Sequence, residues 1–270
     1  MFLKKLNGRM LTVGAMEPRR ALMGLAFLSL ACVAHAGSFV VNPVSVTLSA
    51  SQPVNTITVR NDGSEPTVVQ LEAVAWSQKS GVDVLAKTQE ILATPAVFTI
   101  PPGGSQIVRV GLRRVPDAGA EITYRLFLRE APSVRPVAQG GRAALRMSLP
   151  VFVVPQASLA PKLEWRVMKR EDGKIRLHAS NSGAAHIQIA EVSLASLYGG
   201  KAVGTQKLAA YVLPDNSREW MMRTDSEFPV GTMLRVVTQT DAGEMRTDIV
   251  LESDNAMAPA QPVVAASDPH

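Results

Sequence analysis

Short strand-like runs recur along this chain and are separated by turn residues. Residues 55–60, 67–76 and 105–110 alternate apolar with polar side chains or are rich in β-branched residues. Turn formers such as Asn61-Asp62-Gly63 bound these runs. This spacing, without a long helical period, predicts an antiparallel β-sandwich between residues 38 and 154.

The same pattern restarts after Pro155. Six further strand-like runs follow, which are residues 165–169, 174–179, 186–193, 206–212, 233–240 and 245–251. They predict a second, smaller sandwich. We therefore expect one domain at 37–157, a second at 158–253 and a disordered Ala/Pro/Asp-rich tail at 254–270. The connection is short and contains proline, so we expect the two sandwiches to keep a fixed angle.

The first 36 residues have the layout of a secretory signal peptide. Arg19 and Arg20 precede the apolar run 21–34, and Ala34-His35-Ala36 is a small-x-small cleavage signal. The apolar run is too short to span a bilayer comfortably. We predict cleavage after Ala36 and no stable membrane insertion afterwards.

Other export signals fit this segment less well. Arg19-Arg20 lacks the further residues of a twin-arginine signal, and Cys32 has Ser29 where a lipoprotein signal prefers an aliphatic residue. The n-region is long, so Met10 or Met16 could be the true first residue.

Removing the signal changes the bulk properties of the chain. Its five basic residues leave with one acidic residue, so the formal net charge falls from +5 to +1. The mature chain therefore lacks the strong positive charge that would be the main argument for a nucleic-acid partner. Cys32 is the only cysteine, so the mature chain has no disulfide and must be held together by its core.

Catalytic motifs are absent from the sequence. The mature histidines are His178, His186 and His270, and none has the spacing of a metal ligand set. No Gly-x-Ser-x-Gly elbow occurs, and Gly103-Gly104 lacks the Lys-Ser/Thr of a phosphate loop. We expect no enzymatic activity, no metal and no cofactor.

The strand-like run at residues 143–155 carries an apolar stripe. Its apolar residues on one face are Ala143, Leu145, Met147 and Leu149. The run follows another, residues 123–130, so we expect a hairpin at a sheet edge, where a foreign strand can pair. The stripe could instead pack the domain's own core while Arg146 and Ser148 face water.

Several motifs, taken in order, resemble the periplasmic chaperones of the chaperone–usher pilus pathway. They are Asn61-Asp62-Gly63, Ala93-Thr94-Pro95, Ile100-Pro101-Pro102-Gly103, Val108-Arg109-Val110, Tyr124-Arg125-Leu126-Phe127-Leu128-Arg129-Glu130-Ala131-Pro132 and Leu149-Pro150-Val151-Phe152-Val153-Val154-Pro155. The resemblance covers the first domain well and the second only faintly. It implies an all-β chain of two immunoglobulin-like antiparallel sandwich domains, located in the periplasm.

The resemblance also implies a binding role for the apolar stripe. Such chaperones bind pilus or fimbrial subunits that lack their last strand, lend them an edge strand, and deliver them to an outer-membrane usher. The donor residues would then be Ala143, Leu145, Met147 and Leu149. The alternative is an exported, two-domain structural or adhesive β protein that self-associates.

The family's basic anchors for the terminal carboxylate of the subunit are missing here. Ser45 and Pro150 stand where the family has an arginine and a lysine, which marks the chain as similar to a divergent branch. A guanidinium suits a carboxylate in a partly desolvated cleft. The candidates, in order, are Arg109, Arg125 and Arg146.

The resemblance further implies an acidic pair between the domains. Glu121 and Asp241 stand at the places of the family's interdomain acids, but Val154 replaces the arginine that joins them. Two carboxylates without a base would repel each other. Arg125, near Glu121 in the sequence, is the residue we expect to supply the positive charge.

Overall fold

The computed structural model describes residues 39–114, 119–131, 144–155, 159–197, 202–225 and 227–254. The predicted signal peptide, Ala143 and residues 255–270 of the predicted tail lie outside these ranges. The described chain is built from strands and contains no α-helix. No helix in this part of the chain is therefore long and apolar enough to cross a membrane.

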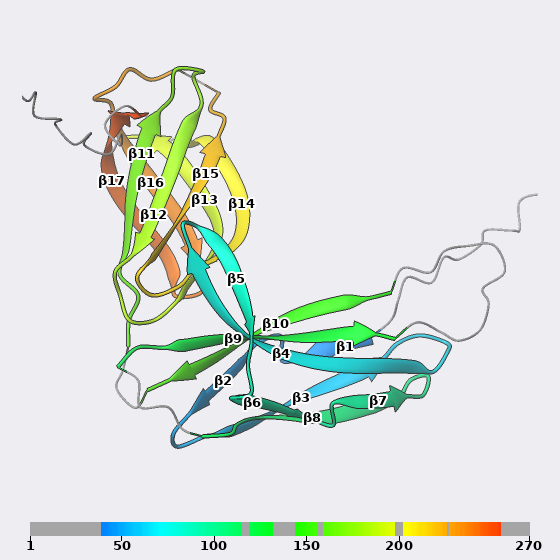
Figure 1. Ribbon diagram of the computed structural model, residues 1–270. Coiled ribbons are helices and arrows are strands. Elements are labelled where there is room, and N and C mark those ends of the chain that lie inside the picture. Colours follow the sequence, from blue (N-terminus) through cyan, green and yellow to red (C-terminus); the bar gives the residue numbers. More distant parts are fainter. Residues whose placement is uncertain are drawn as a thin grey trace, which may run out of the picture. The chain divides into compact units, whose positions relative to one another are not determined.

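The first domain consists of two facing sheets (Figure 1). Its strands are β1 (Phe39–Asn42), β2 (Val46–Ser49), β3 (Val54–Asn61), β4 (Thr67–Lys79), β5 (Val82–Lys87), β6 (Ile91–Thr94), β7 (Val97–Ile100), β8 (Ser105–Leu112), β9 (Ile122–Glu130) and β10 (Arg146–Val154). One sheet has the order β1-β3-β8-β6, and the other has the order β2-β10-β9-β4-β5, with β7 also paired to β4.

The core of the first domain lies between these sheets because each strand alternates in burial. Ile57 and Val59 of β3 are buried, whereas the intervening residues are exposed. On β9, Tyr124 and Leu126 join the same core from the opposite sheet. Each sheet therefore has one apolar inner face and one outer face.

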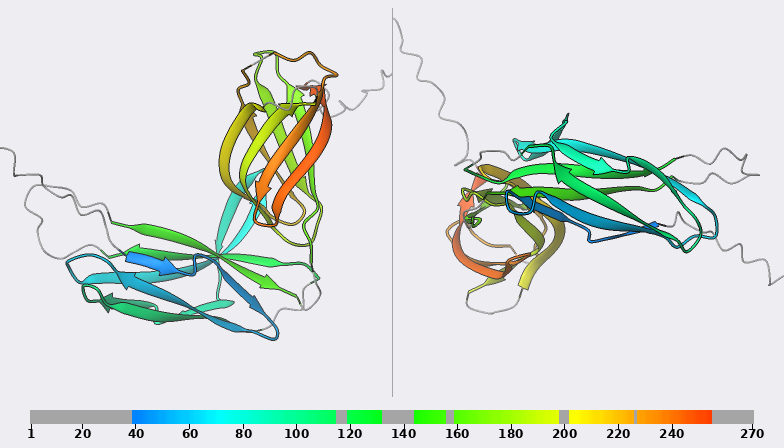
Figure 2. Two further views of the ribbon diagram at one scale, coloured as in Figure 1. Left: turned by 180° about the vertical axis from the view of Figure 1, so that it is seen from behind. Right: turned by 90° about the horizontal axis from the view of Figure 1, so that it is seen from below.

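The second domain is formed by one seven-stranded sheet that curves around its own core (Figure 2). Its strands are β11 (Leu163–Lys169), β12 (Ile175–Asn181), β13 (Ile187–Ser196), β14 (Ala202–Val212), β15 (Asn216–Met222), β16 (Met233–Thr240) and β17 (Gly243–Ser253). Their order is β14-β13-β16-β17-β11-β12-β15, and the one parallel pair among them is β11 with β17.

The predicted all-β fold is confirmed, and the predicted strands correspond to observed ones. The main omission is β15, because the six predicted runs include the other six strands of the second domain but not this one. Its sequence, Asn-Ser-Arg-Glu-Trp-Met-Met, does not alternate apolar with polar residues, so the pattern gives no strand signal. The exact domain boundaries stay a prediction; β10 ends at Val154 and β11 begins at Leu163.

Candidate functional site

The predicted hairpin is formed by β9 and β10, which lie side by side in Figure 1. They pair antiparallel from Arg146 opposite Arg129 to Val153 opposite Ile122. One step beyond the ladder, the Glu130 amide donates to the Leu145 carbonyl at 2.9 Å. This hydrogen bond shows that the backbone carbonyl of Leu145 points toward β9.

The other edge of β10 is only partly covered. Strand β2 pairs with it in parallel, but only at residues 151–154. Among the described residues, no strand pairs with this edge at residues 146–150. Because Leu145 faces β9 and backbone groups alternate along a strand, those of Arg146 and Ser148 point to the open edge. The open segment is thus a ready site for strand addition.

The apolar stripe lies on the inner face of the sheet and becomes more exposed toward the hairpin tip. Leu149 is 2% exposed and belongs to the core of the first domain. Met147 and Leu145 are half-buried and pack against that core from its margin. Packing of the domain's own core therefore accounts for Leu149, whereas Leu145 and Met147 keep accessible surface. Ala143 lies outside the described residues.

Arginines and an aromatic ring cover the outer face of the same hairpin. The Arg146 guanidinium lies 4.2 Å from the centre of the Phe127 ring, and that of Arg129 lies 5.8 Å from it. Arg129 also forms an ion pair with Glu72 at 2.8 Å. Arg146 is exposed and has no such acidic partner within the described ranges.

Arg125 lies farther along this outer face, toward the second domain. Its guanidinium is 3.7 Å from the centre of the Trp76 ring and 5.4 Å from that of Tyr211, at distances typical of cation–π contacts. Burial lowers the pKa of Arg125, although a guanidinium stays charged in proteins. No carboxylate in the described part of the chain forms an ion pair with it. Arg125 is therefore a half-buried cation able to receive an external anion.

Arg109 does not lie near these two arginines on the same surface. It belongs to β8, in the sheet that lacks β9 and β10, and it is exposed between buried Val108 and Val110. Its side chain therefore points away from the opposite side of the sandwich. The structure brings Arg125 and Arg146 onto one face and leaves Arg109 on the other.

Glu121 and Asp241 do flank a base, but this base is His186. The imidazole Nδ1 is 2.8 Å from Oε1 and 2.9 Å from Oε2 of Glu121, and Nε2 is 3.6 Å from Oδ2 of Asp241. The expectation that Arg125 supplies this charge is wrong, because its guanidinium lies over Trp76 instead. His186 was missed because a single histidine before a strand carries no spacing signal.

Apolar and polar contacts of other residues also join the two domains. Trp76 and Phe152 of the first domain pack with Leu213 and Tyr211 of the second. Gln78, which is buried, donates from Nε2 to the Tyr211 carbonyl at 2.9 Å and accepts at Oε1 from the Leu213 amide at 3.0 Å. The interdomain contact thus combines a cluster of mainly aromatic side chains with two hydrogen bonds of Gln78.

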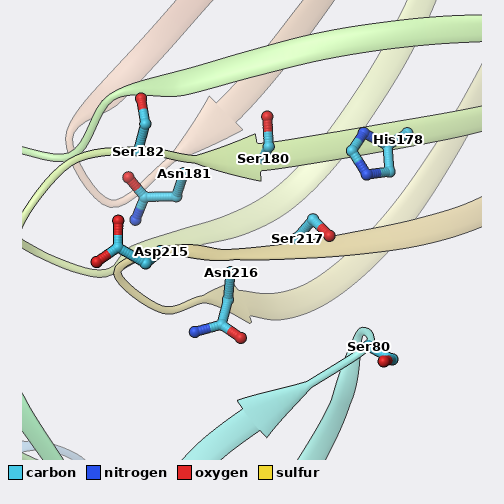
Figure 3. Close-up of a pocket in the computed structure, with 8 residues that line it drawn as sticks. All are labelled: Ser80, His178, Ser180, Asn181, Ser182, Asp215, Asn216 and Ser217. Carbon is cyan, nitrogen blue, oxygen red and sulfur yellow. The ribbon is translucent and has the colours of Figure 1, made fainter.

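A polar hollow of about 410 Å³ lies beside the β4–β5 turn (Figure 3). Figure 3 shows Ser80 of that turn near residues of β12 and β15. The lining residues are Ser80, His178, Ser180, Asn181, Ser182, Asp215, Asn216 and Ser217. None of the residues predicted to bind a subunit lines it. The described residues also contain no group of three or more His, Cys, Asp or Glu side chains that could hold a metal.

Comparison with known proteins agrees with the resemblance seen in the sequence. Residues 38–158 match the family model described as pili and flagellar-assembly chaperone, PapD N-terminal domain. A curated relative, the chaperone protein FimB/FhaD of Bordetella pertussis, is 23% identical over 197 residues, which cover 67% of this chain and 78% of the relative.

Solved structures show the same fold at low sequence identity. One is a chain of the CsuC–CsuE chaperone–tip adhesion subunit pre-assembly complex of Acinetobacter baumannii, with TM-score 0.57 and 20% identity over 80% of this chain and 99% of that one. Another comes from the Salmonella enterica complex of SafA pilin with the SafB chaperone, with TM-score 0.55 and 18% identity over 80% and 97% of the chains. The two-domain immunoglobulin-like fold is thereby confirmed. The first domain, residues 38–158, is thus similar to the pili and flagellar-assembly chaperones described by the PapD N-terminal domain model.

Proposed function

We propose that this chain is a periplasmic chaperone that binds pilus or fimbrial subunits by donating strand β10. The observation that carries the proposal is the open edge at residues 146–150, which has backbone groups directed outward and no paired strand among the described residues. A subunit lacking its last strand needs those main-chain partners and an apolar filling for its groove. The match of residues 38–158 to a chaperone family model also supports a non-enzymatic role.

Side chains on the stripe would set the register of the bound subunit. Leu145 and Met147 keep accessible apolar surface next to the open edge, so they are the main donor residues of this proposal. Ala143, two residues before Leu145 in the sequence, lies outside the described residues and stays a predicted donor residue. Leu149 is already buried in the chaperone's own core, so it would support the strand from within rather than enter the subunit.

Arg125 is the best placed of the three anchor candidates for the terminal carboxylate of a subunit. It shares the outer face of the β9–β10 sheet, is half-buried and forms no ion pair with a carboxylate of the described chain, although the charge of Asp83 acts on it. The Trp76 ring contacts the guanidinium, and a guanidinium can bind a carboxylate through two N–H groups at once. Arg146 is the second candidate. Arg109 is not proposed as an anchor, because it lies on the other sheet.

The rest of the proposal concerns the route of the protein and its subunits. We propose export through the signal at residues 1–36, cleavage after Ala36, and transfer of each bound subunit to an outer-membrane usher. The named complexes of similar fold, a chaperone with a tip adhesion subunit and a chaperone with a pilin, support subunits as the partner class.

Co-expression with exported β proteins encoded nearby tests the proposal. The mature chain should purify in a one-to-one complex with a subunit-like partner. Leu145→Asp should abolish the complex, because it places a charge in the apolar groove of the subunit. Ala144→Asp is the matched control, since it adds the same charge at the exposed neighbouring position. Self-association that Leu145→Asp leaves unchanged would favour the structural or adhesive alternative.

A further inference from the structure

His186 occupies a position where both of its ring nitrogens face carboxylates. Glu121, from the first domain, lies against Nδ1, and Asp241, from the second, lies against Nε2. The Glu121 side chain is only 2% exposed, whereas that of Asp241 is 39% exposed. Backbone amides contribute as well: His186 donates to Glu121 at 3.3 Å, and Gln188 donates to Asp241 at 3.0 Å.

The imidazole ring is also fixed from its face. It stacks on Phe152 of β10 with 3.6 Å between ring centres and 5° between ring planes. The Glu121 amide donates to the Ala184 carbonyl at 3.1 Å, which ties the two segments together beside the ring. Rotation of the ring away from Glu121 would break this stack, so the nitrogens are held toward their acidic partners.

This arrangement depends on the protonation state of the imidazole. A neutral imidazole has one N–H, so one of the two carboxylates would face a nitrogen lone pair. The imidazolium carries an N–H on both nitrogens: Nδ1–H donates to the buried Glu121 carboxylate, which gains a positive partner, and Nε2–H faces Asp241 at ion-pair distance. An arginine in this place would stay charged at every physiological pH, whereas histidine is the side chain that changes charge near neutrality.

We propose that His186 is a proton-dependent clamp between the two domains. In its imidazolium form it joins Glu121 to Asp241, and loss of the proton weakens the link. The contribution of the clamp is therefore present where the imidazole carries both protons and falls as pH rises. It is lost again at more acidic pH, where carboxylates take up protons.

Other charged, titratable and aromatic groups also lie around the His186 imidazole. Tyr211 of β14 lies 5.7 Å away between ring centres, and burial raises its pKa, so it stays neutral over this pH range. Arg125 of β9 is a cation of the same interdomain contact and would oppose the imidazolium, but it lies over Trp76 and Tyr211. The β10 residue that stacks on the ring, Phe152, carries no charge. The two carboxylates are thus the groups in direct contact.

A double-mutant cycle in the mature chain tests the clamp. Glu121→Gln, His186→Gln and the double variant are unfolded in urea at about pH 5.5 and about pH 8. The coupling between Glu121 and His186, which the cycle measures, should correspond to about a tenfold factor in the unfolding equilibrium constant at the lower pH. At the higher pH the factor should be less than about threefold. Equal coupling at both pH values would overturn the proposal. His178→Gln is the control, because His178 has no acidic partner in the described chain and should leave the pH dependence unchanged.

A measurement on the protein with His186 intact keeps the test valid if a variant fails to fold. Spin labels at Thr58→Cys on β3 and Met221→Cys on β15 report the interdomain distance, since both positions are exposed. The distance distribution should be narrow at about pH 5.5 and broader at about pH 8. A distribution that is identical at the two pH values would refute a proton-dependent clamp. Neither experiment requires a subunit, so their outcome is independent of the proposed chaperone activity.

Discussion

Asn61 and Asn181 make the same set of contacts in the two domains. Asn61 Nδ2 donates to the carbonyls of Glu65 at 2.7 Å and Ile100 at 3.0 Å. Asn181 Nδ2 donates in the same way to the carbonyls of Ala185 at 2.7 Å and Val212 at 3.1 Å. Each asparagine also accepts from the glycine two residues later, Gly63 at 2.9 Å and Gly183 at 3.0 Å. Both sandwiches thus use a buried Asn-x-Gly turn to tie a strand end to a distant strand.

Asn181→Ala should destabilise the chain by about 2–4 kcal/mol, because it leaves buried carbonyl and amide groups without partners. Urea unfolding of the mature protein measures this loss. Asn216→Ala is the matched control, since within the described chain the Asn216 side chain donates to the nearby Pro214 carbonyl and to no distant strand. Similar losses for the two variants would contradict the special role of Asn181.

Local sequence patterns were sufficient to predict most strands and turns. Alternation in β3 and β8 and the turn at Asn61-Asp62-Gly63 each depend on residues close together in the chain. The pairing of β9 with β10 also followed from their patterns and the short distance between them in the sequence. Those features can be predicted because they depend on residues close together in the sequence and not on which distant segments pack together.

The parts that were missed depend on which distant segments meet. The burial of Leu149 and the partial exposure of Leu145 depend on which residues of the first domain's core cover them, which no local pattern records. That Arg109 lies on the sheet without β9 and β10 can be known only from the strand order. His186 reaches Glu121 only through the interdomain contact.

Arg125→Met should weaken subunit binding by about tenfold or more, because it removes a charge-assisted contact with the terminal carboxylate. Met keeps the length and apolar contact with Trp76. Binding to a purified subunit, measured by calorimetry, gives the affinity. Arg109→Met is the control and should leave affinity unchanged, since Arg109 lies on the other sheet. A loss with Arg109→Met alone would restore Arg109 as the anchor.

Asp83→Asn should reduce the acid sensitivity of the folded protein. Asp83 of β5 pairs with Arg218 of β15; burial alone would raise its pKa, but hydrogen bonding by Gln78 and the charge of Arg218 lower it overall. A lowered folded-state pKa contributes stability above the unfolded value and loses it as pH falls through the folded value. The native chain should therefore lose more stability below about pH 4 than Asp83→Asn does.

Thermal unfolding at several acidic pH values checks the effect of Asp83. Asp62→Asn serves as the comparison, because its ion pair with Arg60 is exposed and lies within one domain. If Asp83→Asn and the native chain have parallel pH profiles, the Asp83–Arg218 pair does not couple acid stability to the interdomain contact.

Ser148→Pro should weaken subunit binding by roughly tenfold while leaving the fold of the free protein intact. The Ser148 amide points to the open edge of β10, so proline there removes a donor that only an added strand would use. Met147→Pro is the matched control: the Met147 amide points to β9, so this variant should instead lower the free energy of unfolding. Urea unfolding and subunit affinity are measured for both. A stability loss from Ser148→Pro as large as that from Met147→Pro would show that this edge is already used within the free chain.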